Sequence, residues 1–436
     1  MVASNGMKPS TQKNVGTLLG VWLAGCLLMP VLMGVDLALT APLILAAVAG
    51  GIRFWLTRDP TRLRRIALVL SGAALSLAVA DGFLRLTYSH RLKYRPFDEA
   101  FTRFPAYSHQ CRLMPSVKIS RNAYGDLAAM TGVEENRVNR TVILNTDAFG
   151  FRNDWTPVDP VDILMLGDSF CIGVGTTQAD ILPNQLSAAL NKPVYSIAQP
   201  GNPWAELMML KAEVRGNHIR LKEGGHLIWV LFEGNDLEES FRDMDINSFA
   251  NGPLEQMRRR LQNFRADSPI YQTLRRLRKP APTVLTRRID GTNFLFLEKY
   301  CEASQRTIDE VQNHENFVHL KRTVAEMKRL CSDSGTQLHV FLIPTKGRVY
   351  PWILNPEKPR QPDARVSGFS DAMMLLCQEL KIEFQDVNAY LSDRAIDLYE
   401  TEHKFLWWPD DTHWNALGQF EAARFIASRI HSLQDE

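Results

Sequence analysis

The chain has 436 residues, which is enough for one large domain or two ordinary ones with well-buried cores. Hydrophobic residues make up 45% of the chain and charged residues 22%, a composition that excludes a wholly disordered or a fibrous protein. The formal net charge of +2 gives no reason to expect nucleic acid as a partner.

Three hydrophobic segments crowd the N-terminus, namely Val15–Met33, Leu37–Leu56 and Ile66–Leu86. Each approaches the roughly 20 residues that a helix needs to cross a bilayer. A cleaved signal peptide is disfavoured because the apolar region is too long and is repeated. Residues 1–90 are therefore predicted to form a membrane region with three transmembrane helices.

The charges of the short links predict the orientation of this region. Basic residues precede the first segment and fill the link between the second and third, whereas the first link carries none. The positive-inside rule places the basic parts in the cytoplasm. Three spans then export everything after Leu86, whereas two would leave it in the cytosol. We expect a multi-pass protein of the inner or plasma membrane whose large domain is extracytoplasmic, in the periplasm.

Residues 91–144 are predicted to form a small β-rich lead-in with strand-like pieces at Val117–Ser120 and Thr141–Leu144. A polar turn with two buried-type aromatics follows at Asn145–Asn153. It predicts a hairpin packed under a sheet. Alternatively, Arg152 in this turn orients a carboxylate or a substrate.

Strands then alternate with helices through residues 145–436, which we expect to form one α/β domain. This alternation implies right-handed crossovers and a three-layer α/β/α sandwich with a parallel sheet. The predicted strands are Ile163–Leu166, Val194–Ile197, His226–Phe232, Gln337–Ile343 and Glu383–Val387. The predicted helices are Asp180–Leu190, Trp204–Arg215, Glu315–Cys331, Ser370–Leu380 and Leu417–Leu433.

A basic segment, Met257–Arg288, interrupts this order and contains a single acidic residue, Asp267. Its apolar residues recur at roughly helical spacing, which predicts a basic helical insertion at about 250–300. It is either a solvated insertion or a surface that contacts anionic lipid headgroups or an anionic polymer.

Ser169 follows the buried strand 163–166, at the sheet edge where open α/β folds bind their ligands. A serine nucleophile needs a general base, and histidine suits this role near neutral pH. His413 is our candidate base. Asp410, three residues earlier, can reach back to orient its imidazole, as a triad carboxylate does.

An acyl-transfer transition state also needs hydrogen-bond donors for its oxyanion. The backbone N–H groups of Ser169 and Gly201 and the side-chain amide of Asn235 are predicted to supply them. Lys346 and Arg348 lie on a strand-end loop at the same edge, where they either contact an anionic substrate or are simply solvated.

The remaining candidates have structural interpretations. Trp414 could wall the pocket beside the serine, and we keep it as a substrate-binding candidate. Cys171 is expected to be a small buried side chain, because no base is assigned to it. The six cysteines show no scaffold or metal-ligand spacing, so we expect no metal and no cofactor.

The blocks Gly167-Asp168-Ser169-Phe170, Gly201, Gly234-Asn235-Asp236 and Asp410-x-x-His413 follow the order of the SGNH (GDSL-type) hydrolase superfamily, which this chain resembles. The resemblance implies a flavodoxin-like fold and esterase or acyltransferase chemistry. The four blocks span the chain from about residue 145 to its end, and the basic insertion has no counterpart.

Asp411-Thr412-His413-Trp414 is also similar to the Asp-x-His-Trp signature of the alginate O-acetyltransferase branch, whose carboxylate lies two residues before the histidine. In that branch the motif precedes the serine block, whereas here it follows. This order favours Asp410 as the orienting carboxylate and leaves Asp411 as the runner-up.

Together these features predict a membrane-anchored extracytoplasmic serine esterase or O-acyltransferase that forms an acyl-enzyme on Ser169. The resemblance implies an acetyl group and a cell-envelope or exported polysaccharide as substrate. Membrane lipid and a membrane acyl-donor protein are the other expected partners. The alternatives are an esterase of the lipase or lysophospholipase type and a non-catalytic carbohydrate-binding scaffold.

Overall fold

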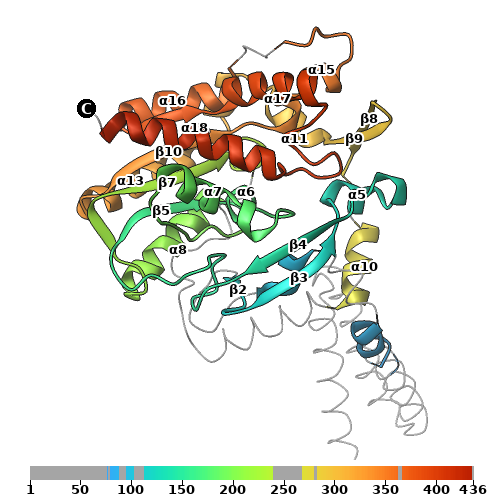
Figure 1. Ribbon diagram of the computed structural model, residues 1–436, viewed down its shortest axis with the longest axis horizontal. Coiled ribbons are helices and arrows are strands. Elements are labelled where there is room, and N and C mark those ends of the chain that lie inside the picture. Colours follow the sequence, from blue (N-terminus) through green and yellow to red (C-terminus); the bar gives the residue numbers. More distant parts are fainter. Residues whose placement is uncertain are drawn as a thin grey trace, which may run out of the picture. The chain divides into compact units, whose positions relative to one another are not determined.

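The computed structural model describes residues 76, 79–87, 95–102, 112–238, 268–278, 282–361 and 366–434. The chain divides into two compact units, residues 1–92 with 250–280 and residues 93–249 with 281–436. The first unit contains a helical stretch over residues 79–87 and helix α10 (Pro269–Arg278). The second unit contains every described β-strand and the candidate site (Figure 1).

The first two predicted membrane spans and most of the third lie outside the described residues. Within the part of the chain that is described, no helix is long and apolar enough to cross a membrane. The described end of the third segment exposes Val79, Phe83 and Leu86, to 63%, 64% and 85%. Their spacing of four and three residues puts these apolar side chains on one face of the helix.

A five-stranded parallel sheet forms the centre of the second unit, with the strand order β11-β10-β7-β5-β6. Trp229 of β7 lies opposite Leu166 of β5 on one side and Val340 of β10 on the other. The strands are β5 (Val161–Gly167), β6 (Val194–Ser196), β7 (Leu221–Phe232), β10 (Gln337–Ile343) and β11 (Glu383–Asp386).

Successive strand residues belong to two different cores, because side chains of a strand alternate between the faces of the sheet. Ile163 and Met165 join one core, whereas Leu164 and Leu166 join the other. Helices α7 (Leu182–Leu190), α17 (Asn388–Glu402) and α18 (Ala416–Gln434) contribute to the first core. Helices α8 (Pro203–Arg215), α13 (Phe317–Asp333) and α16 (Gly368–Glu379) contribute to the second.

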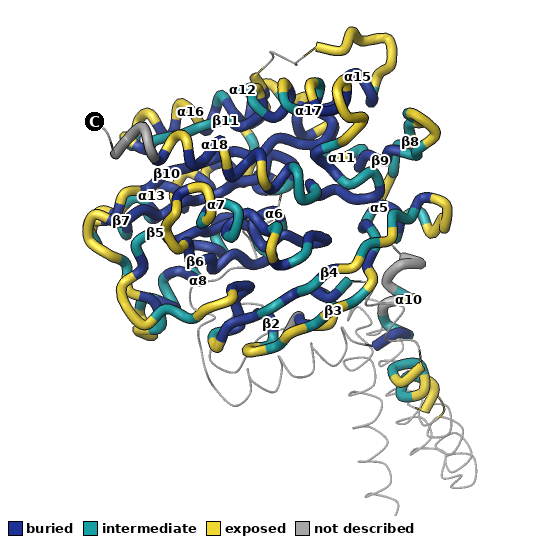
Figure 2. The backbone as a smooth tube through the Cα atoms, viewed as in Figure 1, coloured by how far each residue is buried: buried dark blue, intermediate teal, exposed yellow. Residues whose placement is uncertain are grey.

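The sheet is therefore buried on both faces between two layers of helices, and the tube in Figure 2 is dark blue along its central strands. This arrangement confirms the prediction of an α/β fold with a central parallel sheet. All five predicted strands are present, each within a few residues of its expected bounds. The sequence reasoning missed α17, whose amphipathic pattern is weak.

The described residues form three antiparallel strand pairs outside the central sheet. Strand β1 (Phe101–Thr102) pairs with β2 (Arg112–Leu113), and β3 (Lys118–Ala123) pairs with β4 (Arg140–Asn145). Helix α5 (Asp126–Thr131) and the short 3₁₀ helix η1 (Glu134–Asn136) connect β3 to β4. Residues of this connection contact the turn of the candidate site.

The third pair corrects the predicted helical insertion. Within the described part of that range, α10 is helical, but β8 (Val284–Ile289) and β9 (Thr292–Leu297) form a hairpin. The apolar residues of β9 pack inward, so a strand outcompetes the expected helix there. The remaining short helices of the second unit are α4 (Pro96–Ala100), α6 (Ser169–Ile172), η2 (Gln178–Asp180), α11 (Glu298–Ala303), α12 (Ile308–Gln312), α14 (Lys346–Val349) and α15 (Pro351–Leu354).

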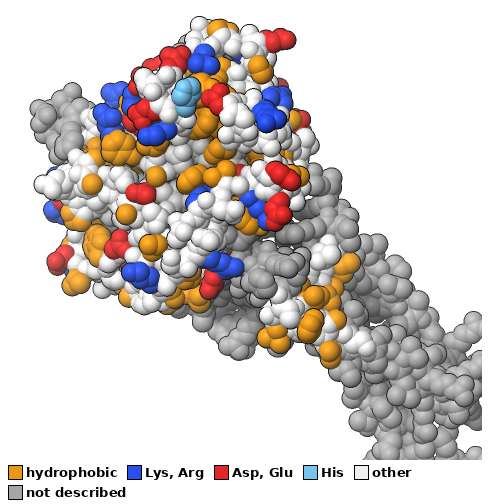
Figure 3. Space-filling view, turned by 45° about the vertical axis from the view of Figure 1, so that its right-hand side comes forward, with side chains coloured by type: hydrophobic (Ala, Val, Ile, Leu, Met, Phe, Trp, Pro, Cys, Tyr) orange, Lys and Arg blue, Asp and Glu red, His pale blue; other side chains and the backbone are white. Residues whose placement is uncertain are grey.

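Among the described residues on the face drawn in Figure 3, neither sign of charge predominates. On the face drawn in Figure 3, acidic and basic side chains are interspersed with small apolar groups. This mixture agrees with the small net charge and with the expectation that nucleic acid is not a partner, which stays a prediction.

Two buried histidines and a glutamate link the neighbouring strands β7, β10 and β11 near the end of the sheet at which β10 begins. His226 Nδ1 of β7 lies 3.0 Å from His339 Nε2 of β10, and His339 Nδ1 lies 2.7 Å from Glu383 Oε2 of β11. Burial lowers the pKa of His226 from its usual 6.5, and the neighbouring His339 lowers it further. This pair is a structural feature of the core.

We predict that acidification weakens the fold through His226. Because its folded-state pKa lies below 6.5, the unfolded chain takes up this proton first, and stability is lost as pH falls from 6.5 through the folded pKa. The difference in melting temperature between the protein and His226→Gln should therefore shrink as the pH is lowered from about 7.5 to about 5.5. The exposed His403→Asn is the control, and a pH-independent gap for His226→Gln would refute the prediction.

Candidate active site

The end of β5 turns so tightly that only glycine fits. A Cβ atom on Gly167 would lie 2.6 Å from Cys171 Sγ and 2.9 Å from the carbonyl oxygen of Val230. The next residue, Asp168, caps α6, because its side chain accepts a hydrogen bond from the Phe170 N–H at 2.8 Å. Ser169 is thereby held at the first position of α6, partly exposed above a buried strand.

The structure brings Ser169, His413 and one carboxylate into a hydrogen-bonded line. Ser169 Oγ lies 2.8 Å from His413 Nε2. On the other side of the ring, His413 Nδ1 lies 2.7 Å from Asp411 Oδ1. This is the arrangement that a serine nucleophile, its general base and an orienting carboxylate require. The two residues predicted as nucleophile and base are thus in contact.

The predicted orienting carboxylate, Asp410, is wrong, and the runner-up Asp411 occupies its place. Asp410 is completely buried and points away from the imidazole. Its side chain accepts hydrogen bonds from the N–H of Gly125 at 2.6 Å and of Val138 at 2.9 Å. Of the two aspartates, only Asp411 binds the imidazole, so the two-residue Asp-x-His spacing identifies the partner and the order of the blocks does not.

Arg140 of β4 holds both aspartates. Its Nη1 donates to Asp410 Oδ1 at 2.9 Å, and its Nη2 donates to Asp411 Oδ2 at 2.8 Å. Its Nε donates to the carbonyl oxygen of Gly175 at 3.1 Å, and its guanidinium lies 4.2 Å from the ring centre of Trp408. The oxygen of Asp411 that faces Arg140 is thus fixed, and the other oxygen is aimed at His413.

The charge of Asp411 controls the protonation of the histidine. Burial alone would lower the pKa of His413, but the hydrogen bond and charge of Asp411 outweigh it and the pKa is raised. Burial would likewise raise the pKa of Asp411, but the hydrogen bond to His413 and the charges of His413 and Arg140 hold it below the usual range. Asp411 therefore stays ionised, and His413 is a stronger base than a free histidine.

Lys346 binds the backbone of the turn that contains Asp410 and Asp411. Its Nζ donates to the carbonyl oxygens of Trp408, Pro409 and Asp411 at 2.8, 3.1 and 3.2 Å. Burial lowers the pKa of Lys346 to about 7, although the charges of Asp410 and Asp411 oppose this change. Neither of the two interpretations left open for Lys346, substrate contact or solvation, fits this geometry, because its three donors are all used within the protein.

Arg152 is also a structural residue, which contradicts its assignment to substrate. Its exposed fraction is 3%, and it donates to the carbonyl oxygens of Ile143, Ile172, Gly173 and Thr176 at 2.7 to 2.9 Å. Burial lowers its pKa to about 9. Residues 146–153 form turns and bends in place of the predicted hairpin, and Arg152 ties the loop after α6 to β4.

Arg348 and Trp414 are likewise enclosed. Arg348 is 3% exposed and pairs with Glu233 and Asp386, each at 3.1 Å. It lines a cavity of about 360 Å³ together with Cys301, but both terminal nitrogens are bound to carboxylates. Trp414 is fully buried, and its Nε1 donates to the Phe170 carbonyl at 3.3 Å. Neither side chain contacts substrate as predicted.

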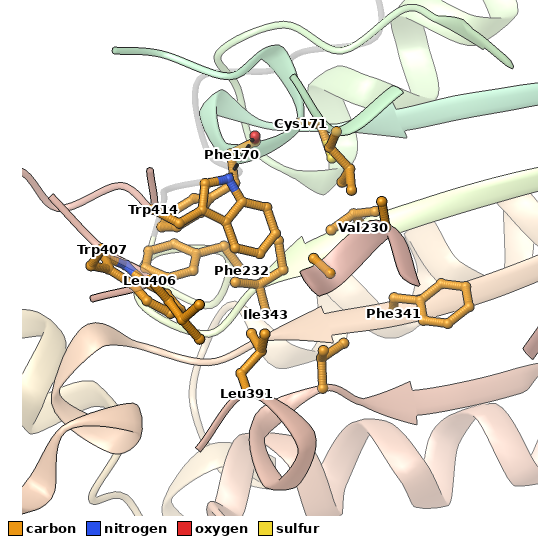
Figure 4. Close-up of a cluster of buried hydrophobic side chains, with 14 of the residues drawn as sticks. Phe170, Cys171, Val230, Phe232, Phe341, Ile343, Leu391, Leu406, Trp407 and Trp414 are labelled. Atoms are coloured by element: carbon orange, nitrogen blue, oxygen red, sulfur yellow. Dashed lines mark hydrogen bonds between the residues drawn. The ribbon is translucent and has the colours of Figure 1, made fainter. Parts of the chain in front are cut away.

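Phe170, the residue after the serine, belongs to a cluster of buried aromatic and aliphatic side chains (Figure 4). The Phe170 ring lies 4.2 Å from Phe232, 4.9 Å from His413 and 5.3 Å from Trp414, measured between ring centres. Cys171 faces this apolar cluster, where burial raises the pKa of its thiol well above the usual range. It is the small buried side chain that the sequence predicted, and its thiolate does not form near neutral pH.

The predicted oxyanion donors lie on the strands that flank β5. Gly201 follows β6 and Asn235 follows β7, and β5 lies between these strands in the sheet. Asn202, next to Gly201, caps α8 by accepting a hydrogen bond from the Ala205 N–H at 2.9 Å. The carboxyl ends of three adjacent strands therefore carry the three candidates, and their function as donors stays a prediction.

One group of described residues has the geometry to hold a metal ion. Asp126, Asp411 and His413 each offer a ligand atom, and these atoms lie within 4.8 Å of one another. In this structure Asp126 is hydrogen-bonded to Thr412, and Asp411 is hydrogen-bonded to His413. The expectation that the protein uses neither a metal nor a cofactor stays a prediction.

Sequence reasoning missed Arg140 and Asp126 as parts of this site. Both precede the serine by more than about twenty-five residues and belong to the lead-in, not to the central sheet. The signal in the sequence that could have pointed to Asp126 is the glycine before it in Tyr124-Gly125-Asp126. Position 125 needs a glycine because the backbone of the Asp410 turn leaves no room for a side chain there. A Cβ atom there would lie 1.9 Å from the backbone oxygen of Asp410.

A serine, a histidine and an aspartate so arranged on an α/β sheet define the class of acyl-transfer enzymes that work through a covalent serine ester. Residues 295–436 match the family described as SGNH hydrolase-like domain, acetyltransferase AlgX. This match confirms the resemblance to the SGNH superfamily, with a likeness to the alginate O-acetyltransferase branch. It supports an esterase or acyltransferase as the kind of protein.

Several solved structures are similar to this chain at low identity. TesA is 12% identical, with 61% of this chain and 96% of that chain covered and a TM-score of 0.30. A Bacillus subtilis protein is 12% identical over 78% and 90%, with a TM-score of 0.36. A carbohydrate esterase family 2 enzyme of Corynascus thermopiles is 12% identical over 68% and 74%, with a TM-score of 0.31. No curated protein sequence matches the chain.

We predict that Asp411 and Asp410 respond differently to loss of charge. Asp411→Asn should slow covalent labelling of Ser169 by a fluorophosphonate probe by roughly 10⁴-fold, because the imidazole loses its orienting charge. Asp410→Asn should cost about 1–3 kcal/mol of stability, through its buried backbone partners, while slowing labelling far less. Equal slowing in both variants, with equal folded fractions by circular dichroism, would contradict this assignment.

Proposed function

We propose that the protein is a membrane-anchored O-acyltransferase that moves an acetyl group through an ester on Ser169 to a polysaccharide outside the cytoplasm. The observation that supports this function best is the hydrogen-bonded line from Ser169 through His413 to Asp411. The match of residues 295–436 to an acetyltransferase domain supports the choice of acyl group.

In the first half-reaction, Ser169 Oγ attacks the acyl carbonyl of the donor as His413 Nε2 accepts the hydroxyl proton. The carbonyl oxygen becomes an oxyanion, and the N–H groups of Ser169 and Gly201 with the Asn235 amide are proposed to stabilise it. The tetrahedral intermediate then collapses. The bond to the leaving group breaks, His413 returns the proton to that group, and Ser169 carries the acyl ester.

In the second half-reaction, a sugar hydroxyl takes the place of the leaving group. His413 Nε2 removes its proton as its oxygen attacks the acyl carbonyl, and the bond to Ser169 Oγ breaks. The proton returns to Ser169, so the enzyme is regenerated and the acyl group has moved from one oxygen to another. Water in place of the sugar would make the same machinery an esterase.

Features of the first unit support membrane anchoring. Val79, Phe83 and Leu86 expose one apolar face at the end of the third hydrophobic segment. Asp81 and Arg85 pair on the same helix at 2.7 Å, which lowers the cost of carrying both charges next to lipid. An anchored enzyme can receive acyl groups from a membrane partner, which supports transfer over hydrolysis.

We expect the purified full-length protein in detergent to release acetate from 4-nitrophenyl acetate, and Ser169→Ala to abolish this release. Acetylated sugar should form at the expense of acetate when an oligosaccharide acceptor is added, because acceptor hydroxyls compete with water for the acyl-enzyme. Mass spectrometry of both products measures this partition. Ser428→Ala, an exposed serine on α18, is the matched control.

Two outcomes would overturn the proposal. Preference for long-chain over acetyl esters, with no sugar product, would identify a lipase-type esterase. Binding of oligosaccharide with no Ser169-dependent turnover of any ester would identify a non-catalytic carbohydrate-binding scaffold.

We further expect the C-terminus to lie outside the cytoplasm. Alkaline phosphatase, which is active only outside the cytoplasm, should be active when fused after residue 436, because three spans export the domain. A cytosolic reporter at the same site should be inactive. The reverse pair of results would leave an even number of spans and place the site in the cytosol.

A further inference from the structure

A second carboxylate lies beside the imidazole of His413. Asp126, the first residue of α5, has its Oδ2 3.8 Å from His413 Nδ1. The same oxygen accepts a hydrogen bond from Thr412 Oγ1 at 2.6 Å, and Oδ1 accepts one from the Thr412 N–H at 2.8 Å. His413 therefore faces two carboxylates, Asp411 in line with its Nδ1 and Asp126 at its flank.

Asp126 is held there by the main chain around it. The Gly125 N–H donates to Asp410 Oδ2 at 2.6 Å, and the Ala128 N–H donates to the Asp410 carbonyl oxygen at 3.1 Å. Helix α5 is thus bound to the turn that carries the catalytic histidine. The main chain that carries Asp126 is therefore fixed beside the imidazole, and the two hydrogen bonds from Thr412 hold the carboxylate itself.

The surrounding charges leave Asp126 with a distinct electrostatic role. Arg140 contacts the carboxylates of Asp410 and Asp411, and Lys346 donates to the backbone of the same turn. Asp126 instead binds the neutral Thr412, and the charged groups that act on it are Asp411, His413, Arg95 and the more weakly coupled Lys346. When His413 takes the serine proton, Asp126 is the additional negative group next to the new positive charge.

We propose that Asp126 is a positioning residue whose negative charge stabilises the protonated imidazole of His413 during the acyl transfer proposed above. This inference rests on that proposed function for its catalytic meaning, but the electrostatic effect exists without substrate. Burial and the charge of Asp411 raise the pKa of Asp126 to about 6. The stabilising charge is therefore present at neutral pH and disappears as pH falls through about 6.

A purely structural role for Asp126 is the competing explanation, since its carboxylate also holds Thr412. The two roles differ in one observable. A structural role changes how much protein is correctly folded, whereas a charge next to the ring changes the pKa of His413 in the folded protein. The titration of His413 therefore separates them.

The experiment uses the full-length protein in detergent with ¹³C-labelled histidine, and the His413 signal is assigned by its loss in His413→Gln. Asp126→Asn keeps the shape and removes the charge, so the pKa of His413 should fall by about 1 to 3. Thr412→Val keeps the charge and removes the hydroxyl, so this pKa should stay near that of the unchanged protein. Asp309→Asn, an exposed carboxylate on α12, is the control.

Enzyme kinetics give the second measurement. The acid limb of kcat/KM should move to lower pH in Asp126→Asn together with the His413 titration, and kcat should fall by up to roughly tenfold each time the pKa of His413 drops by about 1. An unchanged His413 pKa in Asp126→Asn, or an equal change in Thr412→Val, would overturn the inference. If the unchanged protein turned over no ester, the proposed function would be refuted. The titration of His413 without substrate would still test the role of Asp126.

Discussion

The ion pairs that Arg140 makes with Asp410 and Asp411 join the parts of the molecule on which the candidate site depends. Arg140 belongs to a hairpin before the central sheet, whereas the aspartates lie near the end of the chain. Both carboxylates are fully buried, and an unpaired charge there would be costly. The guanidinium removes that cost, and its fork shape fixes which oxygen of each carboxylate it meets. The remaining oxygen of Asp411 is then free to orient His413.

This arrangement explains why two neighbouring aspartates have different functions. Asp410 binds backbone N–H groups of the lead-in, so it fastens the turn to the rest of the domain. Asp411 uses one oxygen for Arg140 and the other for the imidazole. Burial raises the pKa of Asp410, whereas His413 and Arg140 hold that of Asp411 down. Of these two neighbours, the carboxylate that stays firmly ionised is the one that binds the base, which is the condition for raising its basicity.

The central sheet and the Ser169 and His413 pair could be predicted from sequence because their signals are local. Buried parallel strands are short apolar runs, and the turn after β5 contains the residues that a tight turn and a helix cap need. The choice between Asp410 and Asp411 could not be made in this way. It depends on the conformation of a short turn, and that turn is shaped by Lys346 and by partners far away in the chain.

The wrong substrate assignments have a common physical cause. Lys346 and Arg348 were expected on a loop at the sheet edge and Arg152 in the turn before the first strand of the sheet. Lys346 and Arg348 lie in the short helix α14, and long cations such as these can turn inward when buried acceptors are within reach. Arg152 and Lys346 bind carbonyl oxygens of turns that have no regular partners, and Arg348 binds two carboxylates. Backbone carbonyl groups that are buried at the ends of strands need hydrogen-bond donors. A cation near the carboxyl edge of a parallel sheet therefore has two uses, to hold the loops that form a site or to bind what enters it. Here the buried cations serve the first use.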